Sequence, residues 1–195
     1  MPDKLNPHPS LLPARGKEYL VDTHCHLDAA EFAADRDDVA LVAQQGGVTR
    51  IVVPAVERAN FEAVTQLSER LPCCAAALGI HPLYVAHAKD EDVTLLSQLL
   101  ADTPVVAVGE IGLDFYVEGQ DLARQELFFC AQLRLARDFD LPVILHVRRA
   151  VDAILKQLRR YQPRGGIAHA FNGSRQQADI LIDLGFKLGF GGAMT

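Results

Sequence analysis

The fold of this 195-residue chain is organised around the stretch VDTHCHLD, residues 21–28. A short apolar run leads into it and predicts a strand over residues 19–23. Side chains at positions i and i+2 of a strand point the same way, so His24 and His26 are expected to project together from its carboxyl end. Two imidazoles on one rigid element make half of a binding site for a divalent transition metal. The plainer interpretation is two ordinary histidines at a strand end.

Short apolar runs alternate along the chain with segments of helical spacing. Strands are expected at residues 19–23, 50–55, 73–78, 105–108, 142–145, 166–168 and 186–190, and helices at 37–45, 58–70, 91–100, 120–139, 150–161 and 174–184. Strands that are continuously apolar indicate a parallel sheet covered by helices. This pattern fits either an open doubly wound sheet or a (β/α) barrel. No Gly-x-Gly-x-x-Gly follows the first strand, which disfavours the dinucleotide-binding fold.

Composition limits the class of protein. The chain is 49% hydrophobic with a net charge of −6, which allows a sizeable core and argues against a general nucleic-acid coat protein. Residues 1–17 are polar and proline-rich and predict a disordered tail, whereas residues 18–195 predict one barrel domain. Without an 18-residue apolar run or a signal segment, we expect a cytoplasmic protein with no membrane partner, a monomer by default.

Titratable side chains follow the predicted strand ends: His24, His26, His81, Glu110, His146 and His169. In a barrel, all carboxyl ends of the strands open onto one face, where active sites are built. Imidazoles with one carboxylate form a ligand set for divalent metals, and the two oxygens of Glu110 could bridge two ions. Two such ions suit phosphodiester hydrolysis, which needs an activated water and a stabilised leaving oxygen.

Five motifs in this order carry a resemblance to a known family: VDTHCHLD, GIHP, VGEIGLDF, PVILHVR and HAFNG. They resemble the TatD family of metal-dependent hydrolases over residues 19–195. The resemblance implies a TIM-type (β/α)₈ barrel and a deoxyribonuclease, with 3′–5′ exonuclease action on single-stranded DNA. It also implies two divalent ions (Mg, Mn or Zn). His24 and His26 would hold one ion, His146 and His169 the other, and Glu110 would bridge them as the catalytic carboxylate.

The sequence departs from this family in one respect. Nothing in it matches the Glu-Thr-Asp-Ser/Ala-Pro motif that ends the family's eighth strand and supplies a further metal ligand. We therefore expect an incomplete barrel of about seven strands, truncated before the eighth, in which the first metal lacks one ligand.

Three further residues near the predicted strand ends have two interpretations each. Arg148 is predicted to contact a substrate phosphate because its planar guanidinium suits phosphate, and a surface salt bridge is the alternative. His81 is predicted to contact substrate, or else to fix its own loop. Asp114 either orients a ligand or holds the glycine-rich turn. Phe115 and Phe171 could stack on bases, although core or rim packing is the simpler interpretation.

Two other functions remain open at this stage. The same metal site could act on an amide, a lactone or an aminoacyl ester, since an activated water also attacks carbonyls. Alternatively, a chain of this length could be an inactive remnant that cannot close its barrel.

Overall fold

The computed structural model describes residues 20–190, and the tail predicted for residues 1–17 lies outside them. Within this range the strands form one parallel sheet in which spatial order follows sequence order. The strands are β1 (Leu20–Asp22), β2 (Val48–Pro54), β3 (Cys74–Leu78), β4 (Ala107–Asp114), β5 (Val143–Arg148), β6 (Gly166–His169) and β7 (Phe186–Leu188).

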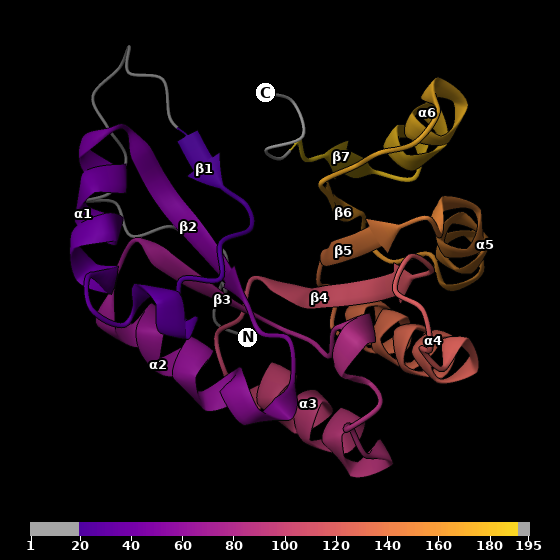
Figure 1. Cartoon of the computed structure of the whole chain (residues 1–195), viewed down its shortest axis with the longest axis horizontal. Coiled ribbons are helices and arrows are strands. Elements are labelled where there is room, and N and C mark those ends of the chain that lie inside the picture. The colour runs from indigo at the N-terminus through magenta and orange to yellow at the C-terminus, as the bar shows by residue number, and fades with distance from the viewer. Residues whose placement is uncertain (1–19, 191–195) are drawn as a thin grey trace.

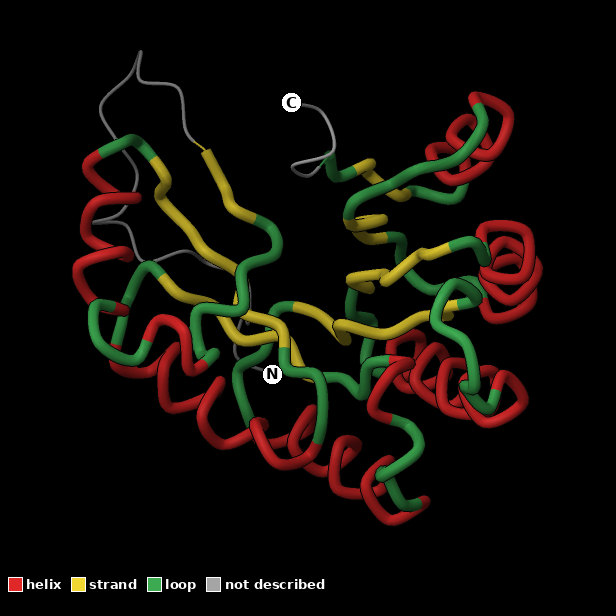
Figure 2. The backbone as a smooth tube through the Cα atoms, viewed as in Figure 1, coloured by secondary structure: helices red, strands yellow, loops and turns green. Residues whose placement is uncertain are grey.

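A helix lies between each strand and the next. The α-helices are α1 (Arg36–Gln45), α2 (Phe61–Arg70), α3 (Asp90–Asp102), α4 (Leu122–Asp138), α5 (Val151–Tyr161) and α6 (Arg175–Asp183). Short 3₁₀ turns are η2 (Ala30–Phe32), η3 (Arg58–Asn60) and η4 (Pro82–Tyr84). The sheet curls so that its strands line the inside of the curve and the helices cover the outside (Figures 1 and 2). No helix between residues 20 and 190 is long and apolar enough to cross a membrane.

The sequential strand order decides between the two architectures expected from the sequence. A doubly wound sheet reverses direction at a switch point, so its strand order does not follow the sequence. The order β1 to β7 and the outer layer of helices are those of a (β/α) barrel, so the predicted fold class is confirmed, with seven strands in residues 20–190. β1 and β7 are the edges of this described sheet and lie at the two ends of the curve (Figure 1).

Burial explains why the central strands are continuously apolar. All eight residues of β4 are buried, between the helical layer and the inside of the curve. Helix α5 packs one face inward through Ile154 and Leu158, while Arg159 on its other face is exposed. This pattern is expected of a parallel sheet that is covered by amphipathic helices.

Strand β4 is longer than predicted, and this changes the setting of Glu110. The expected strand stopped at residue 108, whereas β4 runs from Ala107 to Asp114 and places Glu110 within it. The pairing of β4 with β5 shifts register between Val108 and Ile111, so Glu110 lies in an irregular step. Its backbone N–H donates to the carbonyl of Ala55, 3.1 Å away, just beyond β2.

Glycines allow β4 to lie this close to β5. A Cβ atom at Gly109 would lie 2.6 Å from Cβ of Ile144, and one at Gly112 would collide with the carbonyl oxygen of His146. Gly112 also has φ of 155°, which L residues rarely adopt. The glycines that seemed to end the strand are therefore what let it continue beside its neighbour.

Candidate metal centre

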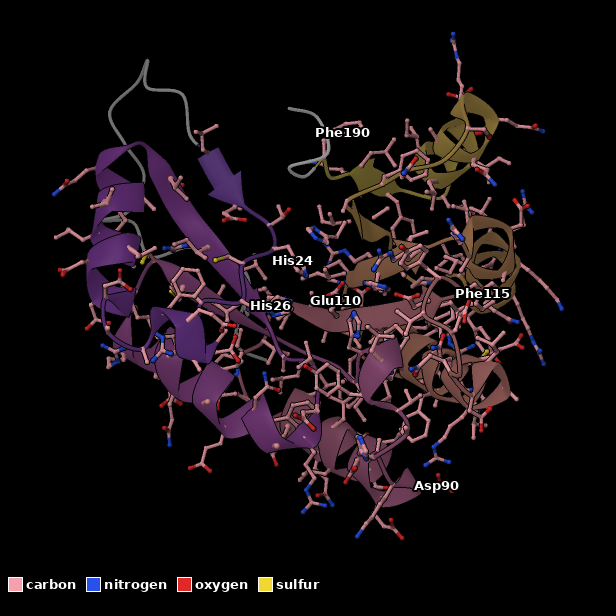
Figure 3. All side chains as sticks on the ribbon, in the orientation of Figure 1. His24, His26, Asp90, Glu110, Phe115 and Phe190 are labelled. Atoms are coloured by element: carbon pink, nitrogen blue, oxygen red, sulfur yellow. The ribbon has the colours of Figure 1, made fainter. Side chains whose placement is uncertain are left out.

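The Glu110 carboxylate is the centre of a cluster of imidazoles inside the curve of the sheet. It is only 2% exposed. Its Oε2 atom lies 2.7 Å from Nε2 of His24 and 3.4 Å from Nε2 of His26. Its Oε1 atom lies 3.0 Å from Nδ1 of His146. Figure 3 shows His24 and His26 beside Glu110, although the first two follow β1 and the third belongs to β4.

Ligand atoms gather in two overlapping groups around this carboxylate. One group contains His24, His26 and Glu110, and the other contains His81, Glu110 and His146; within each, the ligand atoms lie within 4.8 Å of one another. Each oxygen of Glu110 thus faces its own set of imidazoles. This division agrees with two cation positions bridged by one carboxylate.

Hydrogen bonding fixes the tautomer of His26. Its Nδ1 atom lies 3.1 Å from the carbonyl oxygen of Pro54, which can only accept, so Nδ1 carries the proton. In neutral His26 the Nε2 lone pair is then directed at Oε2 of Glu110. Hydrogen bonding to Glu110 raises the pKa of His26 and, with the nearby charges of Glu110 and Asp28, outweighs burial, which lowers it.

At His146 a nitrogen lone pair again faces an oxygen of Glu110, so that two hydrogen-bond acceptors point at each other. Its Nε2 atom lies 2.9 Å from Oδ2 of Asp114, which fixes the proton on Nε2 and turns the Nδ1 lone pair toward Oε1 of Glu110. Burial lowers the pKa of His146, but the hydrogen bonds and charges of Glu110 and Asp114 outweigh it and raise the value. At both oxygens of Glu110, either an added proton or a cation is needed between two acceptors.

The buried carboxylate supports the same interpretation. Burial raises the pKa of Glu110, but its contacts with the imidazoles of His146, His24 and His26 outweigh burial and hold the pKa well below its ordinary value. The group is therefore an anion in a site shielded from water, which requires a compensating positive charge. Two imidazole lone pairs aimed at its oxygens match the nitrogen and oxygen ligands that divalent transition metals prefer. The residues present fit a two-cation centre.

His81 has the opposite tautomer. The backbone N–H of Leu83 donates to its Nδ1 atom over 3.2 Å, so the proton of neutral His81 is on Nε2. That Nε2 lies 3.0 Å from Nδ1 of His146 and 3.8 Å from Oε1 of Glu110. Burial is the main cause that lowers the pKa of His81 to about 4, so the ring is neutral near pH 7. Although His81 lies near enough to be a ligand, its Nε2 is a hydrogen-bond donor.

His169, at the carboxyl end of β6, lies against His24. Its ring stacks on that of His24 with centroids 3.6 Å apart, and its strand pairs in register with β5 at His146. Burial, followed by the charge of His24, lowers the pKa of His169 to about 4. The ring is neutral near pH 7, so one of its nitrogens carries a lone pair that can act as a ligand.

Four of the five predicted metal ligands, His24, His26, Glu110 and His146, belong to these two groups, whereas His169 lies beside them, stacked on His24. The assignment of all five as ligands stays a prediction. The sequence left the role of Asp114 open between orienting a ligand and holding a turn, and the structure shows both. One oxygen faces His146, while the other accepts from the backbone N–H groups of Tyr116 and Val117, at 2.8 and 3.0 Å. The Pro54 carbonyl, which orients His26, left no signal in the sequence because it is a backbone group.

Comparison with known proteins establishes the family. A family model described as TatD-related DNase matches residues 21–195. The chain belongs to the TatD family. The crystal structure of YjjV, a TatD homologue from Escherichia coli, superposes with a TM-score of 0.86 at 42% identity, covering 90% of this chain and 69% of that one. A TatD-family hydrolase from Entamoeba histolytica, at 19% identity and a TM-score of 0.77, shows the same fold.

Two relatives carry names that state an activity. The chain is 44% identical over 179 residues to YjjV of E. coli, an uncharacterized metal-dependent hydrolase, covering 90% of this chain and 69% of that protein. It is 32% identical over 176 residues to the 3′-5′ ssDNA/RNA exonuclease TatD of Pantoea sp., covering 89% of this chain and 68% of that protein. This TatD chain is therefore a member of a family of metal-dependent hydrolases.

Proposed function

We propose that this chain hydrolyses phosphodiester bonds of single-stranded nucleic acid, from the 3′ end, with two divalent cations. The observation that carries the proposal is the buried Glu110 carboxylate, with a separate group of imidazoles at each of its oxygens. The nucleic-acid substrate is supported by the relative from Pantoea sp., a 3′-5′ ssDNA/RNA exonuclease. This exonuclease is 32% identical to the chain, compared with 44% for YjjV.

The chain's own residues divide the work of the site. His24, His26, His146 and His169 would hold the cations, and Glu110 would bridge them. When bound, the cations would supply an activated water and a sink for the charge that develops on the phosphate oxygens. Asp114 and the carbonyl of Pro54 keep the lone pairs of His146 and His26 turned inward. These contacts prepare the site before substrate arrives.

We propose that His81 contacts the substrate itself. Its Nε2–H points into the cluster, and its neutral ring can donate to a phosphate oxygen without adding a proton to the site. Burial, the main cause, lowers the pKa of His81 to about 4, so this donor persists through the neutral range. We therefore keep His81 as a substrate contact and assign it no cation.

The test is digestion of a 5′-labelled single-stranded oligonucleotide by the purified chain with Mg²⁺, Mn²⁺ or Zn²⁺, compared with chelator. We expect a ladder of products that shortens from the 3′ end. Glu110→Gln should reduce the rate about 10³-fold, equivalent to several kcal/mol of lost charge stabilisation. The control is Glu69→Gln, an exposed carboxyl in the last turn of α2.

A parallel screen of esters, lactones and amides separates the substrate from the site. Metal-dependent hydrolysis of one of these, with the oligonucleotide left intact, would overturn the nucleic-acid assignment while keeping the metal centre. Equal oligonucleotide digestion by Glu110→Gln and by the wild-type chain would overturn the metal centre as well.

A further inference from the structure

An exposed group of arginine and aromatic side chains lies at the carboxyl ends of β4 and β5. The guanidinium carbon of Arg148 lies 3.8 Å from the ring centroid of Tyr116, and that of Arg149 lies 4.6 Å from it. Tyr116 is 46% exposed and its neighbour Phe115 is 40% exposed. Large aromatic groups in water are costly, so their gathering with two cations on one rim needs an explanation.

Backbone contacts hold this group in place. Oδ1 of Asp114 accepts from the N–H of Tyr116, which bends the chain directly after β4. The N–H of Phe115 donates to the carbonyl of Arg148 over 2.9 Å, which ties this bend to the end of β5. Arg149 has φ of 54°, a left-handed conformation that is uncommon for a residue other than glycine. Such backbone is often found at binding sites.

Neither arginine is neutralised by a carboxylate within the described residues. In contrast, Arg58 pairs with Asp92 over 2.9 Å, and Arg70 pairs with Asp37. In a chain with a net charge of −6, these two guanidiniums against one ring form a local cationic site. A planar guanidinium binds phosphate through two parallel hydrogen bonds, and its contact with tyrosine restricts its motion beforehand.

This group is connected to the metal centre through one side chain. Asp114 accepts from Tyr116 at one oxygen and lies 2.9 Å from Nε2 of His146 at the other. Asp114 and Arg148 are also direct neighbours in the pairing of β4 with β5. Figure 3 shows Phe115 beyond Glu110, past the carboxyl end of β4. A strand with its terminal phosphate at Glu110 could therefore continue over this rim.

We propose that Phe115, Tyr116, Arg148 and Arg149 form a subsite for single-stranded nucleic acid next to the metal centre. Arg148 and Arg149 bind backbone phosphates, Tyr116 positions their guanidinium planes, and Phe115 stacks on an unpaired base. The subsite rests on the proposed function, since the strand that it holds is the substrate. It favours unpaired strands because a base inside a duplex offers no free face to Phe115.

The test is fluorescence anisotropy of a labelled single-stranded 12-mer with the full chain in chelator, so that nothing is cleaved. The paired change Arg148→Gln with Arg149→Gln should weaken binding about tenfold and lower the slope of log K against log salt by about 1.4, for two phosphates. Phe115→Ala should weaken binding at least about fivefold. That loss should disappear with an abasic 12-mer, because such a strand has no base to stack.

Matched controls separate the subsite from charge or folding effects. Arg160→Gln removes an exposed guanidinium that lies 5.4 Å from the ring of Tyr161, a similar pair at the far end of α5, and should leave binding unchanged. Tyr116→Leu removes the ring that both guanidiniums contact and should weaken binding about as much as loss of one arginine. Parallel measurements with a DNA and an RNA 12-mer show which sugar is preferred. Weaker binding of the variants to either nucleic acid supports the subsite.

Several results would overturn the subsite: no detectable binding by the wild-type chain, unchanged affinity in the arginine pair, or equal affinity for duplex and single strand. Separate outcomes distinguish it from the proposed function. Digestion of the oligonucleotide with unchanged affinity in all the variants removes the subsite and keeps the hydrolase. Binding that depends on these four residues, without digestion by the wild-type chain, keeps the subsite and removes the hydrolase.

Discussion

Strands β4 and β1 supply the same site from very different surroundings. All eight residues of β4 are buried, whereas all three of β1 are exposed at the edge of the described sheet. Glu110 is therefore fixed by packing on both sides. The segment after β1 depends on individual hydrogen bonds to β2, from the N–H of Cys25 to Val52 and from His26 to Pro54. The half of the centre on β4 is therefore rigid, whereas the half after β1 is tethered by individual hydrogen bonds.

The largest expected effect comes from the rigid half. Glu110→Gln removes the charge shared by both cation positions, so affinity for Mn²⁺ or Zn²⁺ should fall about 10³-fold and neither ion should bind at micromolar concentration. His26→Gln changes only the tethered half and should leave one ion bound. Isothermal titration calorimetry gives both stoichiometries. Loss of both ions in His26→Gln would show that the two halves are not independent.

The close approach of β4 to β5 predicts a large loss of stability. Gly112→Ala places a Cβ against the His146 carbonyl and strains a backbone with φ of 155°, so the free energy of unfolding should fall by about 3 kcal/mol. Gly119→Ala is the matched control, because Gly119 has φ of 76° but nothing within 4 Å of a new Cβ. It should cost about 1 kcal/mol. Urea denaturation measures both, and equal losses would show that strain alone, without the collision, sets the cost.

Within the rigid half, Asp114→Asn tests how the tautomer of His146 is held. An amide can turn its NH₂ group toward Nε2 and leave the proton on Nδ1, facing Glu110. Metal affinity should then fall about 10–100-fold, with little change in unfolding. Asp121→Asn is the control, since Asp121 only caps α4 by accepting from the N–H of Arg124. A metal affinity in Asp114→Asn equal to that of wild type would exclude this role.

The smallest effect concerns pH. Burial, the main cause, lowers the pKa of His81 to about 4 in the folded chain, below its ordinary value of 6.5. Between these two pKa values the unfolded state binds more protons than the folded state. His81 therefore lowers the free energy of unfolding as pH falls, by up to about 2 kcal/mol between pH 7 and 5. His26 and His146, with raised pKa values, act in the opposite direction.

A comparison of variants isolates the His81 contribution. In chelator, the melting temperature of His81→Gln should depend less on acid than that of wild type, by a few degrees between pH 7 and 5. His87→Gln is the control, because His87 is exposed in the loop before α3. Parallel pH curves for His81→Gln and wild type would mean that His81 keeps its ordinary pKa.

Local sequence patterns predicted most of the strands and helices and most of the residues that meet at the site. Apolar runs and helix stops predicted the alternating elements, and the rule that strand ends meet brought His24, Glu110 and His146 together. Boundaries were less predictable where tertiary contacts override local preference. Gly109 and Gly112 suggested the end of a strand, whereas their lack of a side chain is what lets β4 continue beside β5.

The finer chemistry of the site depends on contacts that no local pattern encodes. The donor role of His81 depends on one backbone N–H, that of Leu83, and the orientation of His26 depends on the Pro54 carbonyl. Arg148 was predicted to contact phosphate from its place two residues after His146. Its pairing with Tyr116 could not be predicted, because the bend at Asp114 brings that ring across from another loop.

The two oxygens of Asp114 make occupancy at the centre and at the rim interdependent. One oxygen of Asp114 faces His146 and the other shapes the loop of Tyr116. If a cation held by His146 orders this carboxylate and favours strand binding at the loop, thermodynamic reciprocity requires the strand to strengthen cation binding by the same factor. Such a chain would take up its cofactor most readily in the presence of its substrate.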